Sequence, residues 1–362
     1  MIRRSIFVLL VVLAVPLSAQ RVVSRIEVRG NVPASIVIPQ SALVEGRSYT
    51  DADLEVAVAR IRRLPFVYEA RYSFEDGALV LDVTGMTPFF FELDAIGTKS
   101  QFADGGIAIF SGGGRLFAGD GGVVQATVGK LTGDASSRVF GLEYANYGIA
   151  GTRLFAIASG ELTTTDDGFE PDPTYSLTVG YPLTVRQTLS ATAIRSGFEA
   201  HREFEFFTTD SESEQTAFQL RWAYDTSDDP FFALRGTTAT VSASRTWVES
   251  HNESIIIQVP SGNVVRTSSD SDGHITSLGA DAIRFWPLGR RGAVTTRLET
   301  ILDDEDITVI RNGEFAEPRD ANIRGARVAV GYAHNFFDSI ATHAKSRHRA
   351  EFALGASRRE LD

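Results

Sequence analysis

Apolar and polar side chains alternate along most of the chain after Pro88. The alternation is clearest in residues 176–181, 218–224, 240–247 and 349–354. A period of two is typical of β-strands, because successive side chains point to opposite faces of a sheet. About twelve such segments, separated by Gly, Asp, Ser and Pro clusters, predict an antiparallel, mainly β structure for residues 87–362.

The same alternation fits a soluble β-sandwich and a transmembrane β-barrel, and three features favour the barrel. The segments are about nine to twelve residues long, which suits a tilted membrane-crossing strand. Aromatic residues gather near segment ends, as at Tyr181, Trp247 and Trp286. The polar positions include charged residues in mid-strand, such as Arg221 and Glu351, which can line a lumen. A soluble periplasmic β-protein is the alternative.

Long acidic stretches separate several of the alternating segments. They span residues 163–173, 205–214, 249–273 and 303–320. Long loops outside and short turns inside are typical of outer-membrane barrels. We therefore expect these stretches to be external loops.

Residues 21–86 form a different pattern, which predicts a small α+β domain. An alternating strand at 24–29 is followed by an apolar segment at 33–44 that suits a helix. Thr50 and Asp53 then form a capping-box variant before a helical pattern that Pro65 ends. Two further strands flank a turn at 75–77, which gives the order β-α-α-β-β.

Residues 1–20 have the pattern of a cleaved secretory signal. Arg3 and Arg4 precede an apolar run over residues 6–15, and small residues follow it up to Ala19. The run is short for a membrane-spanning helix, although a retained N-terminal anchor is the alternative. No other apolar run is long enough for a membrane-spanning helix. If the exported protein enters a membrane, it must therefore do so as a β-barrel.

Composition excludes several function classes. The 362 residues include no cysteine, which excludes disulfides, thiol catalysis and a lipid-modified cysteine anchor. The net charge of −11 argues against nucleic acid as a partner.

No motif predicts catalysis, a metal site or a cofactor. His201, Glu203 and Glu205 alternate like metal ligands, but they are better explained as the solvated edge of an acidic stretch. The segment 270–273 resembles half of a calcium loop without its closing Glu, and glycines 112–114 lack the Lys-Ser/Thr of a phosphate loop. We expect no enzyme activity, no metal and no cofactor.

Two stretches resemble a known family. The first comprises residues 26–31, 46–50 and 64–70 and looks like a POTRA domain, the polypeptide-transport-associated module of the periplasm. The second is residues 224–236, which resemble the Asp-rich turn ending in Arg-Gly of BamA- and TamA-like outer-membrane assembly factors. Residues 146–152 are also similar to a strand connection of that family. The chain is identified as a reduced member of that family, with one POTRA domain and about twelve barrel strands where the family has sixteen.

The resemblance implies a fold, a location and a function. Residues 1–20 are the signal peptide, 21–86 the periplasmic POTRA domain and 87–362 a surface-antigen-type barrel in the bacterial outer membrane. The function would be assembly, insertion or translocation of unfolded outer-membrane or secreted polypeptides. These clients would add as strands to the POTRA edge and to a seam between the first and last barrel strands. The lipid bilayer and periplasmic or lipoprotein accessory factors are the other expected partners.

The expected site residues fall into three groups. Client binding is assigned to Ile26, Val28, Gly30, Asn31, Ala70 and Tyr72. The family turn, a structural element, comprises Asp225, Asp228, Asp229, Pro230, Arg235 and Gly236. A lumen loop motif is assigned to Arg324 and Gly325, with Arg324 either paired with Glu299 or Glu351 or an ordinary lumen or loop arginine.

A competing function belongs to another class. A small barrel of this kind also suits a porin, an adhesin or a surface antigen without insertase activity, in which the N-terminal domain is only a periplasmic plug or dock.

Overall fold

The structure is a computed structural model. It describes residues 20–361 except 101–102, 120, 133–136, 166–168, 172, 205–206, 230–232, 259–262, 312–313 and 336–348. The expected signal peptide lies outside the described residues, apart from Gln20. Among the described helices, none is both long and apolar enough to span a membrane.

The N-terminal domain contains two helices and two small sheets. Its elements are β1 (Gln20–Val23), β2 (Arg25–Gly30), α1 (Ala34–Ser41), β3 (Arg47–Thr50), α2 (Asp51–Arg62), β4 (Val67–Glu75) and β5 (Ala78–Gly85). The main sheet has the order β2-β5-β4, with β2 parallel and β4 antiparallel to β5. The short strands β1 and β3 pair with each other. The sequence pattern did not indicate that second pair.

Local sequence explains where α2 begins. The Thr50 side chain accepts a hydrogen bond from the Asp53 amide, and the Asp53 carboxylate accepts one from the Thr50 amide. This reciprocal capping box satisfies donors that the first helical turn leaves unpaired. The apolar stripe of α2 includes Leu54, Val58 and Ile61, which are all at most 2% exposed. The predicted helix and its capping box are confirmed.

The remaining strands form the barrel. They are β6 (Phe89–Ser100), β7 (Ala103–Ala118), β8 (Gly122–Thr132), β9 (Ser137–Asn146), β10 (Phe155–Thr165), β11 (Phe169–Pro171), β12 (Thr174–Thr184), β13 (Gln187–Phe204), β14 (Phe207–Asp225), β15 (Gly236–Gln258), β16 (Asn263–Leu288), β17 (Gly292–Arg311), β18 (Glu314–Asn335) and β19 (Arg349–Leu361). A short 3-10 turn, η1 (Ile149–Gly151), lies between β9 and β10.

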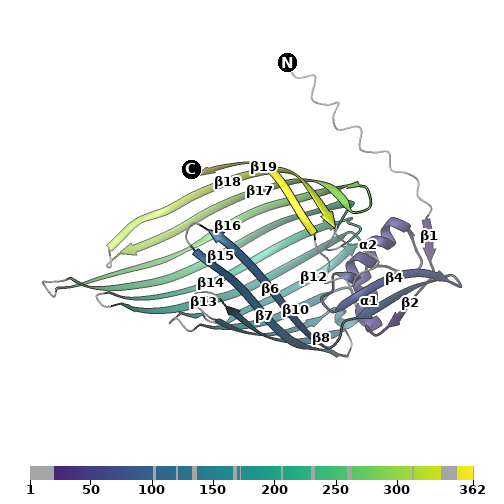
Figure 1. The fold of residues 1–362 in the computed structure, drawn as a ribbon, viewed down its shortest axis with the longest axis horizontal. Helices are drawn as coiled ribbons and strands as arrows, with labels where there is room; N and C mark the ends of the chain where they lie inside the picture. Colours follow the sequence, from purple (N-terminus) through teal and green to yellow (C-terminus); the bar gives the residue numbers. More distant parts are fainter. Residues whose placement is uncertain are drawn as a thin grey trace, which may run out of the picture.

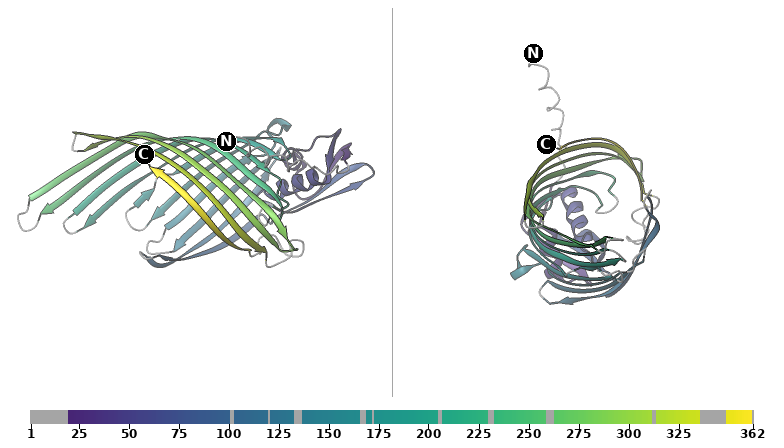
Figure 2. Two further views of the ribbon diagram at one scale, coloured as in Figure 1. Left: turned by 90° about the horizontal axis from the view of Figure 1, so that it is seen from above. Right: turned by 90° about the vertical axis from the view of Figure 1, so that its left-hand side faces the viewer.

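These strands belong to one antiparallel sheet. It is fourteen-stranded and runs from β6 to β19 in chain order, except that β11 leaves the path to pair with β13. The end-on view of Figure 2 shows the sheet curled into a ring. Among the described residues, no ladder joins β6 to β19, so these two strands are the free edges of the sheet. The mainly β fold with a small α+β domain is confirmed. In the described residues, thirteen strands lie on the path of the sheet, against about twelve expected, and β11 is its fourteenth strand.

The two faces of the barrel sheet differ in polarity. Large apolar side chains such as Leu177, Phe218 and Val328 are 49%, 52% and 55% exposed and share the outer face by strand alternation. The opposite face carries hydroxyl pairs and the ion pair between Arg297 and Asp281. An apolar exterior around a polar interior is the arrangement of a barrel in lipid.

The expected long external loops are wrong for three of the four acidic stretches. Residues 207–214, 249–258 and 263–273 lie in β14, β15 and β16, and residues 303–311 and 314–320 lie in β17 and β18. Ser, Thr, Asp and Glu side chains occupy both faces of these strands, so apolar and polar positions do not alternate visibly in the sequence. Backbone hydrogen bonds to the neighbouring strands keep these segments extended. The stretch at 163–173 is also partly strand, in β10 and β11. In Figure 1, strands β13–β18 extend far beyond the end of the barrel opposite the N-terminal domain.

Candidate functional site

The N-terminal domain packs against one end of the barrel (Figure 1). Tyr147 and Asp225, from the two barrel segments that the sequence analysis singled out, contact the domain there. Buried residues of the domain and of the barrel form one continuous cluster, to which the barrel contributes Val123, Ala145, Tyr147 and Val185. Seen along the barrel axis, the helices of the domain lie behind the opening of the ring (Figure 2). The junction is therefore a packed interface.

The turn at residues 225–236 is held by its own aspartates. Asp225 accepts hydrogen bonds of 2.7 Å from both the amide and the hydroxyl of Ser227. Asp228 accepts from the amides of Leu234 at 2.9 Å and Arg235 at 3.2 Å. Carboxylates that cap backbone amides are typical of Asp-rich turns. The predicted turn chemistry is present for these two aspartates, while Pro230 lies outside the described residues.

Gly236 closes this turn in a conformation that requires glycine. Its φ is +106°, and a Cβ atom would lie 2.2 Å from the carbonyl oxygen of Thr226. A side chain therefore has neither the dihedral angle nor the space. The Thr226 amide donates to the Thr237 carbonyl at 2.8 Å across the same point.

Arginines at the C-terminal end of α2 bind this turn. Arg63 forms an ion pair with Asp225 and donates to the Ser227 hydroxyl at 3.0 Å. Arg62 lies 4.0 Å from the carboxylate of Asp229, which is itself buried. Asp225 therefore stabilises both the turn and the attachment of the N-terminal domain, and Asp229 contributes to the attachment.

Two further contacts join α2 to the barrel end of β12 and β13. Arg60 donates to the Gln40 carbonyl at 3.1 Å and to the Thr188 hydroxyl at 2.8 Å. Arg186, in the turn between the two strands, lies 2.7 Å from the Asp53 carboxylate. Arg60 thus connects both helices to the barrel. Asp53, which belongs to the capping box of α2, also binds the barrel through Arg186.

Electrostatics at the junction keep these groups charged. Burial lowers the pKa of Arg60 to about 10, and the positive charges of Arg63 and Arg153 add to the effect while Asp225 opposes it. Arg60 therefore remains a cation at neutral pH. Burial alone would raise the pKa of Asp53, but hydrogen bonds from Thr50 and the charge of Arg186 more than offset it and lower the pKa.

The lowered pKa of Asp53 predicts a pH-dependent junction. Since the folded state binds this proton more weakly than the unfolded state, Asp53 contributes stability above the ordinary Asp pKa of about 4, and the contribution is lost as the pH falls through the folded pKa. We expect Asp53→Ala to destabilise α2 by about 1 kcal/mol at neutral pH through the lost cap. Urea unfolding across pH should show the wild-type and variant curves converging at acid pH. An equal difference at all pH values would contradict this assignment.

The connection between β9 and β10 packs against α1. A Cβ atom on Gly148 would lie 2.4 Å from the carbonyl oxygen of Ser35 and 3.2 Å from Pro39. Gln40 donates to the carbonyl of Tyr147 at 2.9 Å. Glycine at position 148 therefore allows the backbone of the barrel to approach α1 closely, and the connection between β9 and β10 is a docking element.

Phe66 is the aromatic centre of the junction. It is 2% exposed, and its ring centroid lies 5.4 Å from those of both Phe117 and Tyr147 in edge-to-face geometry. The guanidinium of Arg115 lies over the same ring at 5.9 Å. Edge-to-face pairs stabilise beyond the area that they bury.

The expected client-binding residues lie on the two edges of the N-terminal sheet. Ile26 and Ala70 point into the core, with 8% and 1% exposure, while Val28 and Tyr72 are half-buried. Asn31 accepts from the Gly85 amide at 2.6 Å and Gly30 has a φ of +111°, so both shape the end of β2. Any client contact at these positions would therefore use the backbone more than the side chains.

The expected lumen loop at Arg324 and Gly325 is wrong. Both residues lie within β18, opposite Leu302 and Ile301 of β17. Arg324 is exposed on the same face as Val328 and Val330, so it points outward and away from Glu299. The glycine after the arginine resembles a loop motif locally, but ladder pairing on both sides keeps the segment extended. The Glu351 side chain lies outside those described.

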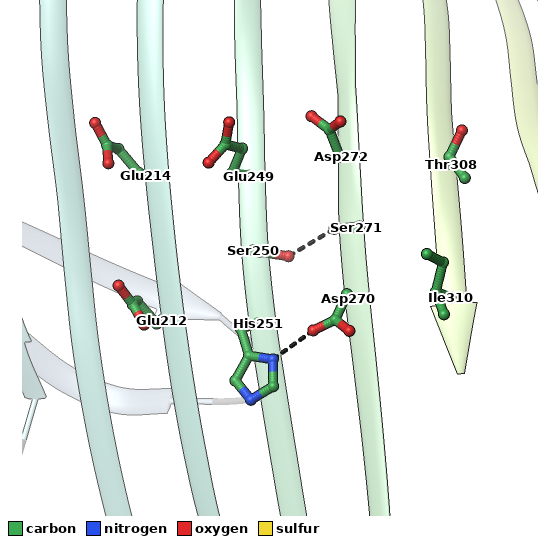
Figure 3. Close-up of a pocket in the computed structure, with 10 residues that line it drawn as sticks. All are labelled: Glu212, Glu214, Glu249, Ser250, His251, Asp270, Ser271, Asp272, Thr308 and Ile310. Carbon is green, nitrogen blue, oxygen red and sulfur yellow. Dashed lines mark hydrogen bonds and ion pairs between the residues drawn. The ribbon is translucent and has the colours of Figure 1, made fainter. Parts of the chain in front are cut away.

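A hollow of about 540 Å³ lies on the extension of β14–β17 (Figure 3). Its lining includes five carboxylates, Glu212, Glu214, Glu249, Asp270 and Asp272. His251 is hydrogen-bonded to Asp270, and Ser250 to Ser271 at 2.6 Å. The calcium-like segment 270–273 is thus part of a strand. Within the described part of the chain, no group of three or more His, Asp or Glu side chains is arranged to hold a metal ion.

Sequence reasoning missed the arginines of the junction. Arg60, Arg62 and Arg63 give α2 a basic C-terminal turn, which was visible in the sequence but has an ordinary explanation in the helix dipole. Their partners lie far away in the chain, at residues 188, 229 and 225. A search for basic clusters matched to the Asp-rich turn could have suggested the pairing.

Comparison with known proteins gives distant structural similarity only. No family model and no curated protein matches the chain. Among solved structures, BamA from Haemophilus ducreyi lacking POTRA domains 1–3 is 10% identical with a TM-score of 0.35, over 93% of this chain and 84% of that one. CdiB from Acinetobacter baumannii is 8% identical at 0.37, over 93% and 74%. The ferric yersiniabactin uptake receptor FyuA from Yersinia pestis is 12% identical at 0.39, over 78% and 53%.

Proposed function

We propose that this chain is an outer-membrane factor that assists the insertion or translocation of other polypeptides. The observation that carries the proposal is the fixed position of an open-edged sheet at one mouth of a barrel with an apolar exterior. The junction residues hold the N-terminal domain there, and its edge strand β4 pairs with β5 alone in the sheet. A polypeptide that adds to this edge is then held next to the barrel.

The free side of β4 can be assigned from one contact. The carbonyl of Ala70 accepts a hydrogen bond of 3.2 Å from Arg62 and therefore points away from β5. Strand alternation gives the backbone groups of Tyr72 and Phe74 the same direction. Backbone pairing at this edge requires no particular client sequence, which suits a general assembly factor.

The edges of the barrel sheet give a second place for clients. Strands β6 and β19 have no ladder with each other among the described residues. Unpaired backbone groups at a strand edge are a template for another strand. We place the seam for client strands between Phe89–Ser100 and Arg349–Leu361. Periplasmic and lipoprotein accessory factors are further proposed partners.

The edge assignment predicts a position-specific loss of activity. Proline at position 72 removes the amide that points to the client and keeps the pairing with β5, because proline is tolerated on the open side of an edge strand. We expect Tyr72→Pro to slow the folding of an unfolded barrel client in liposomes about five- to tenfold, the cost of about one backbone hydrogen bond. The gel shift of the folded client measures the rate.

Tyr72→Ala is the matched control, since it removes the same side chain and keeps the amide. It should retain most of the acceleration. An equal loss in both variants would assign the effect to the side chain. Folding at the wild-type rate with Tyr72→Pro, or no acceleration by the wild-type protein after it has inserted, would contradict the proposed function.

A second candidate function is a diffusion pore, which the polar inner face favours. Hydroxyl pairs such as Ser159 with Ser176 at 2.7 Å and Thr178 with Thr192 at 2.9 Å line it together with the Arg297–Asp281 pair. Single-channel recording in planar bilayers separates the two functions. A pore conducts steadily without a client, whereas an assembly factor with the N-terminal domain at its mouth conducts little.

A further inference from the structure

Two Arg-x-Trp segments lie on neighbouring barrel strands and face outward. They are residues 245–247 of β15 and 284–286 of β16. Trp247 and Trp286 are 45% and 50% exposed. The guanidinium of Arg245 lies 5.6 Å from the Trp247 ring centroid, and that of Arg284 lies 4.9 Å from the Trp286 ring centroid. The same pairing of a cation with an aromatic face thus occurs twice.

The register places the two pairs at opposite borders of one apolar band. Arg245 lies opposite Thr276, and Arg284 lies opposite Thr237. The outward positions between these levels are all apolar: Ala239, Val241 and Ala243 on β15, and Leu278, Ala280 and Ala282 on β16. In both segments the arginine and the tryptophan are successive outward-facing residues, and the arginine is the one nearer the middle of the band.

The spacing agrees with the thickness of a membrane. Trp247 lies opposite His274, which is twelve residues from Trp286 along β16. Twelve residues span about 40 Å of strand, or about 28 Å along the membrane normal at a tilt of about 45°. The lipid-facing band of outer-membrane barrels is about 25 Å tall. The tryptophans therefore lie at the two interfaces, and each arginine reaches toward its interface along the tryptophan ring.

The charges of these two arginines lack an internal counter-ion among the described side chains. Other barrel arginines have one, such as Arg195 with Glu214 and Arg297 with Asp281. Arg284 donates to the Thr237 hydroxyl at 2.7 Å, which carries no charge. A guanidinium stacked on a ring keeps its edge donors available, and their fork geometry matches phosphate oxygens.

We infer that Arg245 and Arg284 each bind the phosphate group of an anionic membrane lipid, one at each face of the bilayer. Charge complementarity and interfacial depth select this occupant. The rings of Trp247 and Trp286 position the guanidinium groups, each ring lying on the hydrocarbon side of its lipid headgroup. The inference rests on one part of the proposed function, that the barrel lies in a membrane. It does not depend on whether the protein assists other polypeptides.

Brominated lipids test each site separately, because bromine quenches tryptophan fluorescence at short range. A protein with Trp222→Phe and Trp286→Phe reports on Trp247 alone, and one with Trp222→Phe and Trp247→Phe reports on Trp286. Each is reconstituted in mixed phosphatidylglycerol and phosphatidylcholine vesicles in which only the first lipid, or only the second, is brominated. We expect the anionic fraction beside each tryptophan to exceed the bulk fraction about two- to fivefold, the range for an exposed ion pair.

Variants then locate the effect. Arg245→Gln should abolish the excess at Trp247 and leave it at Trp286, and Arg284→Gln should do the reverse. Arg221→Gln is the matched control, since Arg221 lies on the opposite face of β14 from Leu220 and carries the same charge. Quenching that follows bulk composition, or equal loss with Arg221→Gln, overturns the inference. Absence of quenching by either lipid overturns it together with the membrane placement, whereas client folding can fail without affecting these signals.

Discussion

Replacing Phe66 with alanine is expected to release the N-terminal domain from the barrel and to destabilise it. The ring is 2% exposed and contacts the core of the domain as well as Phe117 and Tyr147. Truncation of a buried phenylalanine costs about 3–5 kcal/mol through lost burial and the cavity that remains. Pulse proteolysis in urea, with the barrel kept in micelles, should show cleavage of the domain at a much lower urea concentration.

Phe89→Ala is a suitable control because Phe89 is 73% exposed. Its effect should stay within about 0.5 kcal/mol, as for most surface substitutions. A wild-type cleavage midpoint for Phe66→Ala would mean that the aromatic cluster does not hold the junction.

The second large effect is expected at Gly148. Alanine there would place a Cβ atom 2.4 Å from the carbonyl oxygen of Ser35. Because this oxygen belongs to the backbone, a side-chain rotation cannot relieve the clash and a segment of the backbone must move. We expect α1 to withdraw from the connection between β9 and β10 at a cost of about 1–3 kcal/mol, the range for overpacking. Hydrogen–deuterium exchange of the α1 peptides should become faster.

Gly141→Ala provides the comparison on β9. A Cβ atom at that position would lie 3.7 Å from Thr127, an ordinary contact. Exchange in α1 should be unchanged with this variant. Unchanged exchange with Gly148→Ala would instead show that the two segments separate freely in solution.

Local patterns predicted the N-terminal domain well. The order of its main strands and helices follows from alternation, from the Thr50 capping box and from Pro65 after α2. The strands β1 and β3 were missed because each has only four residues, which is too short for a period to be visible. The small second sheet depends on contacts between distant segments, and those leave no local signal.

In the barrel, the pattern located strands where one face is apolar and failed where both faces are polar. Residues 249–258 and 263–273 are strands with acidic and hydroxyl side chains, so their hydrophobic alternation is weak. The same limit explains Arg324, whose Arg-Gly sequence is common in loops but which pairs on both sides here. Strand identity in such regions comes from the neighbouring ladders.

The junction was only half visible in the sequence. The Asp-rich turn and the glycine-containing connection were noticeable because turn chemistry is local. Their partner, the basic end of α2, has an independent local explanation, so nothing in the sequence joined the two. Interfaces between segments more than a hundred residues apart require a structure or an alignment.

The contacts of the N-terminal domain are distributed unevenly around the barrel, and this has a mechanical consequence. They involve residues in or beside four turns: Phe117 and Gly121, Tyr147 and Gly148, Arg186 and Thr188, and Asp225 and Ser227. These turns connect strands between β7 and β15. A force applied to the domain along the barrel axis therefore enters the sheet through those strands. In the described part of the chain, the hydrogen bonds and ion pairs of the domain do not reach β16–β19. We therefore expect the force to pass to these strands through the ladder with β15, and the sheet to shear there first under tension.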